Sequence, residues 1–300
     1  MLADLVLALA WSGRLAEAEK LGRDVLARRI DPAAALSFRS GLVRALTWQG
    51  RPAEALGHAG LQPDEPVDGH DGAMLAADTA LAGLLAFNFP SAVAMAARAE
   101  ELAHASDNDL ALCQALSVRA WVTMFLGRPH DAVELAHRAI AIADTSEDGS
   151  AHLAHPSFFA GMPLVLLDRL DEADRILQDG RRGAEEMGLV WNLPLYHAHL
   201  GVKKFVGGEW DAAVAELEAS LAIADQIHLS SPIVAAASAW LSVIQIHRDD
   251  LEAADRTIAQ ALKRMPEKGP QGGPLLNWAR AVLHETKSET AEALALLQAA

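Results

Sequence analysis

Cysteine and tyrosine are almost missing from this chain of 300 residues, which contains one of each. A single cysteine cannot form an internal disulfide bond. Cys113 lies in an apolar stretch, so we expect a buried, unreactive thiol and a reducing compartment. Aromatic residues make up only 5% of the sequence. Because sheets favour aromatic and β-branched residues whereas alanine and leucine favour helices, the composition predicts an all-helical protein.

Positive charge is also scarce, with 25 Lys and Arg against 40 Asp and Glu and a formal net charge of -15. Surfaces that bind nucleic-acid backbones need clustered Lys and Arg, so we expect no direct nucleic-acid binding. No apolar run approaches the ~18–20 residues that a membrane span needs. The first segment, MLADLVLALAW, lacks the basic start of a signal peptide. These absences predict a soluble, cytoplasmic protein without a membrane partner.

The common catalytic and metal-binding signatures are lacking as well. The sequence contains no GxxxxGK[ST] phosphate loop, GxSxG elbow, HExxH motif or paired CxxC. His197 and His199 are two residues apart on a predicted helix, so they diverge by about 200° and cannot both face one ion. An acidic loop lacks the ligand spacing of a calcium site; it contains Asp64, Glu65, Asp68 and Asp71. We therefore predict no enzyme activity, no metal and no cofactor.

What the sequence does contain is an internal repeat of about 40 residues. Seven segments share one pattern: GRLAEAE from Gly13, GRPAEAL from Gly50, GRPHDAV from Gly127, DRLDEAD from Asp168, GEWDAAV from Gly208, RDDLEAA from Arg248 and SETAEAL from Ser288. A weaker eighth copy, FNFPSAV, begins at Phe87. Five residues after each start the sequence has alanine: Ala18, Ala55, Ala92, Ala132, Ala173, Ala213, Ala253 and Ala293. Such a period is the mark of a solenoid.

Each recurrent residue has a physical reason in a helical hairpin. The first residue of a copy, often glycine, allows the left-handed backbone that ends a helix. The acidic residue four places on favours the positive end of the next helix dipole. The alanine lies where two antiparallel helices cross closely. The residue seven places before the turn is often small too, as in Ala80, Ala120, Gly161, Gly201 and Ala281.

Prolines after capping or flexible residues mark helix starts, so the first helices of the hairpins are predicted at 33–48, 72–86, 108–125, 155–167, 193–206, 232–246 and 274–285. Longer loops are predicted at 61–72, 144–150 and 265–273. A single hairpin cannot bury its own apolar face, so neighbouring hairpins must stack. We predict an all-α solenoid of about eight antiparallel helix pairs, wound as a right-handed superhelix. Residues 1–300 would form a single repeat domain, a fragment of a longer protein.

Residues 13, 10, 6 and 3 places before each turn share one face of the first helix and are predicted to line the inner surface. This set is called the stripe. The candidate binding residues on its apolar middle part are Gln114, Trp121, Met124, His155, Phe158, Met162, Val202 and Phe205. On either side the stripe is more polar, with Ser37, Ser40, Arg44 and Thr47 and with Ala235, Ser238, Ser242 and Gln245. Two interpretations remain open: the apolar residues are core, or they receive an apolar small molecule or an amphipathic segment of a partner.

The segments GRPAEAL and GEWDAAV, followed by helices rich in Ala and Leu, resemble tetratricopeptide repeats. The longer phrases GRPHDAVELAHRAIAIAD and DRLDEADRILQDGRR resemble the helical sensor region of large LuxR-type ATP-dependent bacterial transcriptional regulators, the group of the maltose-regulon activator. The resemblance implies a sensor segment that binds an effector and passes the signal on. The ATP-binding loop and the DNA-reading helix of that group are absent from these 300 residues. The alternative is a general protein-binding scaffold, and the last helix offers a face on which a second copy can stack.

Overall fold

The computed structural model describes residues 2–28, 30–62, 67–227, 229, 231–264 and 273–298, and this part of the chain folds into sixteen α-helices without a strand. The helices are α1 (Leu2–Trp11), α2 (Leu15–Leu26), α3 (Pro32–Trp48), α4 (Pro52–Ala59), α5 (Gly69–Leu85), α6 (Phe89–Ala105), α7 (Asp109–Phe125), α8 (Pro129–Thr145), α9 (Pro156–Leu166), α10 (Leu170–Glu186), α11 (Leu193–Val206), α12 (Trp210–Gln226), α13 (Pro232–His247), α14 (Leu251–Arg264), α15 (Gly273–Thr286) and α16 (Thr290–Gln298). Short 3-10 helices precede α9 and α11, at Ser150–Ala154 and Val190–Asn192. The prediction of an all-α solenoid of eight helix pairs is confirmed.

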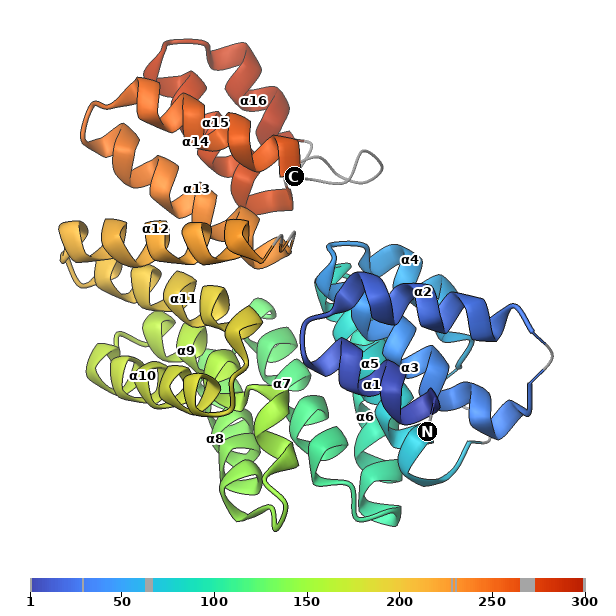
Figure 1. Ribbon diagram of the computed structural model, residues 1–300. Helices are drawn as coiled ribbons and strands as arrows, with labels where there is room; N and C mark the ends of the chain where they lie inside the picture. The colour runs from blue at the N-terminus through green and yellow to red at the C-terminus, as the bar shows by residue number, and fades with distance from the viewer. Residues whose placement is uncertain are drawn as a thin grey trace. The chain divides into compact units, whose positions relative to one another are not determined.

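The helices form two compact units, residues 1–180 and 181–300, with the boundary inside α10. In the first unit the odd-numbered helices pack in a row, α1 on α3, α3 on α5, α5 on α7 and α7 on α9. In the second unit, α11 packs on α13 and α13 on α15. In seven hairpins the odd-numbered helix also packs against the even-numbered helix, for example α5 on α6 (Figure 1). In the remaining hairpin, Gly161 of α9 lies close to Leu177 of α10. Each unit is thus a layered stack of hairpins.

One backbone turn closes all eight hairpins. Its central residue has φ between +56° and +81°, and these residues are Gly13, Gly50, Phe87, Gly127, Asp168, Gly208, Asp249 and Ser288. The next residue donates its N–H to the carbonyl five residues earlier, as Arg128 does to Thr123 at 3.1 Å. This Schellman arrangement satisfies a carbonyl at the helix end and reverses the chain. The predicted left-handed turn therefore recurs throughout the described chain.

The turn residues correct the repeat register in the seventh copy. The sequence pattern starts that copy at Arg248, but the left-handed residue is Asp249. Ala254, five residues after Asp249, is fully buried, whereas the predicted crossing residue Ala253 is only half-buried. The prediction of Ala253 is therefore wrong by one position. The stripe on α13 shifts with it from Ala235, Ser238, Ser242 and Gln245 to Ala236, Ala239, Val243 and Ile246.

Close packing at the crossings requires small residues, as the sequence predicts. A Cβ atom on Gly201 would come within 2.6 Å of Leu217 Cγ, and one on Gly161 within 2.7 Å of Leu177 Cδ2. At contacts this short a neighbouring atom must shift, so glycine lets these helices approach without strain. The crossing alanines Ala173 and Ala213 are fully buried.

The helix starts agree with the sequence to within three residues. Asp31 caps α3 by accepting hydrogen bonds from the N–H groups of Ala33 and Ala34, with Pro32 as the first helical residue. In the predicted acidic loop, Asp64 and Glu65 lie outside the described residues, as does the segment 265–272. Within the described part of the chain, no helix combines the length and the apolar character needed to span a membrane.

Candidate functional site

The structure places most of the predicted stripe residues in the interior. In the first unit Gln114, Trp121, Met124, His155 and Phe158 are buried and Met162 is half-buried, and in the second unit Val202 is buried and Phe205 half-buried. The indole N–H of Trp121 donates to the carbonyl of Phe159 at 3.0 Å. The more polar residues Ser37, Ser40, Arg44 and Thr47 are buried as well. The stripe thus contributes to the core of each unit, and ligand binding at these residues stays a prediction.

The first helices of three hairpins in the first unit contribute to one buried polar cluster, called here the polar triangle. It consists of Arg44 of α3, Asp78 of α5 and Gln114 of α7. Their exposed fractions are 1%, 0% and 2%. Arg44 Nη1 lies 3.0 Å from Asp78 Oδ1 and 2.9 Å from Gln114 Oε1, and Gln114 Nε2 donates to Asp78 Oδ1 at 2.9 Å. Ser40 Oγ donates to the second carboxylate oxygen at 2.5 Å. Each member of the triangle therefore bonds the other two.

Arg44 also lies against an aromatic ring, because its Cζ atom is 3.0 Å from the ring centroid of Trp11 on α1. Burial lowers the pKa of Arg44 to about 10, and Asp78 opposes that shift by favouring the charged form. The guanidinium is therefore still a cation at neutral pH. Burial, assisted by the positive charges of Arg44 and His152, lowers the pKa of His155 to about 3. His155 is thus a neutral imidazole, suited to hydrogen bonding and not to charge pairing.

Five of the seven phenylalanines form one continuous cluster with Trp121 in the first unit. Trp121 contacts the rings of Phe158 and Phe159 at centroid distances of 5.2 Å. Trp121 also contacts Phe125 at 6.1 Å, and Phe125 stacks on Phe89 at 5.5 Å with an interplanar angle of 17°. Phe87 meets Phe89 and Phe125 edge-on. The buried candidates Trp121 and Phe158 are thereby continuous with rings at the surface.

The surface part, called the aromatic patch, consists of Phe87, Phe89 and Phe125. Phe87 is 52% exposed and Phe125 46% exposed. Phe87 also occupies the left-handed turn position with φ of 56°, where four other copies have glycine. A bulky residue in this region is a true outlier, and such strain concentrates at functional sites. Neither burial nor backbone preference accounts for phenylalanine here, so this residue marks a candidate binding surface.

A second row of aromatic rings lies in the second unit. Phe205 of α11 contacts Trp210 at 5.5 Å and Trp240 at 5.6 Å, and Trp240 contacts Trp278 of α15 at 5.3 Å. All four rings are half-buried. The predicted residue Phe205 is thus the first of a row in which each ring is partly covered by the next.

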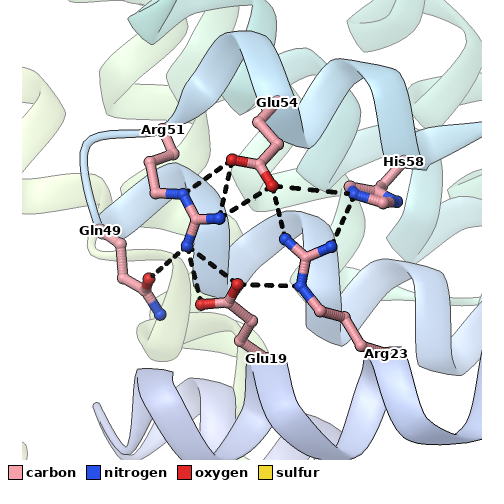
Figure 2. Close-up of polar contacts among 6 residues, drawn as sticks. All are labelled: Glu19, Arg23, Gln49, Arg51, Glu54 and His58. Carbon is pink, nitrogen blue, oxygen red and sulfur yellow. Dashed lines mark hydrogen bonds and ion pairs between the residues drawn. The ribbon is translucent and has the colours of Figure 1, made fainter. Parts of the chain in front are cut away.

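Away from the stripe, a charged network ties α2 to α4 in the first unit (Figure 2). Arg51 bonds both Glu19 and Glu54, and Arg23 bonds the same two carboxylates. Arg23 Nη1 also lies 3.1 Å from His58 Nε2. Burial raises the pKa of Glu54, but the hydrogen bonds from Arg23 and Arg51 outweigh it, so the net pKa is below the ordinary value. This network links neighbouring hairpins, and its two arginines are balanced by its two glutamates.

No reactive centre emerges from the other candidates. Within the described residues, no group of three or more His, Cys, Asp and Glu side chains is placed to hold a metal ion. His197 pairs with Glu216 at 2.7 Å, while His199 is buried. Burial raises the pKa of the Cys113 thiol well above its ordinary value, which disfavours the nucleophilic thiolate. Among the described residues, these candidates therefore supply neither a metal site nor a reactive thiol.

Sequence reasoning missed Asp78 and Phe87. Asp78 is a single charge inside the apolar run AMLAADTALAGLL, and an isolated charge in such a run is the signal that its partner is also buried. Phe87 begins the weakest copy of the repeat. A phenylalanine at a position where other copies have glycine is the sequence signal that this residue has a separate role.

Comparison with known proteins finds similarity at the level of structure. No protein-family model matches the sequence, and no curated protein matches it. A Rap protein in complex with competence and sporulation factor superposes with a TM-score of 0.71 at 14% identity, covering 99% of this chain and 85% of that one. NprR bound to its cognate peptide NprX gives 0.64 at 12% identity, covering 99% and 86%. An APC/C hetero-tetramer gives 0.62 at 18% identity, covering 99% of this chain and 52% of that one. The chain therefore has the fold of the tetratricopeptide-like helical-repeat proteins.

Proposed function

We propose that this chain is a non-catalytic helical-repeat domain that binds a peptide segment through the aromatic patch. The observation that carries the proposal is Phe87, which keeps a half-exposed ring in a strained turn, edge-on to the exposed ring of Phe125 and the half-buried ring of Phe89. Exposed aromatic side chains supply large apolar areas to a partner at low entropic cost. The structure of NprR, which shares the fold, is a complex with its cognate peptide NprX, and this supports a peptide as the ligand class.

In its finer form the proposal assigns the chain to the sensor segment of a cytoplasmic bacterial regulator. The resemblance of its longer repeat phrases to LuxR-type regulators supports this assignment. The second candidate is a scaffold without a sensory role, which the similarity to the APC/C hetero-tetramer favours. A small apolar effector remains a third type of ligand, and it would raise the melting temperature in the absence of any peptide.

The test begins with a library of random 12-residue peptides displayed on phage and selected on the immobilised protein. The most enriched peptide, carrying a fluorophore, is then titrated with wild-type protein and two variants while anisotropy is measured. Phe125→Ala should weaken binding at least tenfold, which corresponds to about 1.4 kcal/mol. Val206→Ala is the matched control, because Val206 also precedes its turn residue by two positions and is 47% exposed. Equal affinities for the two variants would refute the aromatic patch as the binding surface.

A further inference from the structure

The polar triangle connects the same helices that present the aromatic patch. Asp78 belongs to α5, whose C-terminal turn carries Phe87. Gln114 belongs to α7, whose last residue is Phe125. The direct bond between Gln114 Nε2 and Asp78 Oδ1, at 2.9 Å, therefore joins the two helices that lead to the two most exposed rings.

The triangle also reaches beyond adjacent hairpins. Repeats in a solenoid usually contact only their neighbours. Arg44 and Gln114 are 70 residues apart, so their hydrogen bond connects the second and fourth hairpins past the third. With Asp78 bonded to both, three helices are held at three points, which leaves little freedom for one to slide past another.

We infer that Gln114 and Asp78 are positioning residues for the aromatic patch: their bond fixes the axial register of α7 against α5 and so holds Phe125 in stack with Phe89. Because a helix is stiff along its axis, a constraint at Gln114 also fixes the axial position of Phe125. The two residues are roughly 16 Å apart along the helix, at 1.5 Å per residue. A slip of one residue would displace Phe125 by about 1.5 Å along its axis. A displacement of that size changes the separation and the offset of rings whose centroids are 5.5 Å apart. The positions of the rings do not depend on the proposed function. The effect of Gln114 and Asp78 on peptide binding rests on the proposed function.

The buried cluster has a simpler alternative role, which is to stabilise the fold without affecting the patch. Ser117 provides the matched control, since it lies on the same helix and is fully buried. Its hydroxyl donates to the Cys113 carbonyl of its own helix at 2.8 Å and does not tie α7 to α5. Ser117→Ala thus removes a buried hydrogen bond from α7 and leaves the helix register intact.

Ring positions are read without any ligand by incorporating 4-fluorophenylalanine at the seven phenylalanine positions and recording fluorine NMR spectra. Each resonance is assigned by a Phe→Leu variant. Gln114→Leu should move the Phe89 and Phe125 resonances by more than their line widths, while Ser117→Ala leaves them in place. Phe205, in the other unit, reports on general unfolding. If Gln114→Leu unfolds the first unit, Gln114→Asn replaces it, because the shorter amide stays polar but cannot reach both partners. Patch resonances that do not move in the folded Gln114 variant would overturn the inference.

Binding of the selected 12-residue peptide then tests the functional consequence. Gln114→Leu should weaken binding about tenfold, and the double variant with Phe125→Ala should bind no more weakly than Phe125→Ala alone, because both changes act through one ring. Additive losses would contradict action through Phe125. If Phe125→Ala itself leaves binding unchanged, the proposed function fails while the fluorine result still decides the positioning role.

Discussion

Replacing Asp78 with leucine should be among the most destabilising single changes in the first unit. The substitution leaves the Arg44 guanidinium buried without its carboxylate. At the 3.0 Å separation of Arg44 Nη1 and Asp78 Oδ1, an effective dielectric constant of 20 gives an attraction of about 5.5 kcal/mol. Gln114 and Trp11 retain their contacts with Arg44, which reduces the loss. We expect a cost of about 3–5 kcal/mol, the range measured when one partner of a buried ion pair is removed.

Amide hydrogen exchange followed by mass spectrometry measures this cost in the first unit separately from the second. Protection of the amides in α3 and α5 should fall by roughly two to three and a half orders of magnitude, and peptides from residues 181–300 serve as the internal reference. A triple variant with Arg44→Met, Asp78→Leu and Gln114→Leu should recover most of the loss, because apolar side chains can replace a buried charge cluster. A cost under about 1 kcal/mol for Asp78→Leu would refute the reasoning, since that is the range of an exposed pair.

Three further outcomes follow from the structure. Gly201→Ala should lower the free energy of unfolding by about 1–3 kcal/mol in urea denaturation, because the new Cβ meets Leu217 at 2.6 Å, whereas Gly57→Ala, with nothing within 4 Å, should be neutral or stabilising. Cys113 should resist iodoacetamide in the native protein and react only after denaturation, as mass spectrometry would record; rapid native labelling would contradict its burial. Because the pKa of Glu54 is below its ordinary 4.5, its stabilisation is complete above that pH and is lost as the pH falls through the lowered pKa. Glu54→Gln should therefore reduce the acid sensitivity of the melting temperature.

The fold was predictable because each hairpin repeats the same turn and the same close helix crossing. The left-handed turn, the buried alanine and the small residue opposite it all leave marks in the sequence at fixed spacing. The single error in register arose at Arg248, Asp249 and Asp250, where three polar residues can each be read as the turn. Only the backbone angle of Asp249 and the burial of Ala254 decide between them.

The candidate site was less predictable, since it depends on contacts between hairpins. Helical periodicity groups Gln114 and Trp121 on one face, but it does not say whether that face meets water or another helix. The hydrogen bond that Arg44 donates to Gln114 joins residues 70 positions apart, a separation at which no local pattern applies. Phe87 was visible only as an exception to the repeat, and its meaning needed its φ angle and its exposure.

The hydrogen bond between Arg44 and Gln114 also limits how this solenoid can be re-engineered. Excising or duplicating the α5–α6 hairpin would leave the chain with complete repeats, yet it would remove Asp78 or push Arg44 and Gln114 one layer further apart. In the second unit the ion pairs Arg248–Asp211 and Lys287–Asp255 each join adjacent hairpins. Grafts of whole hairpins are therefore better placed there than among the first four.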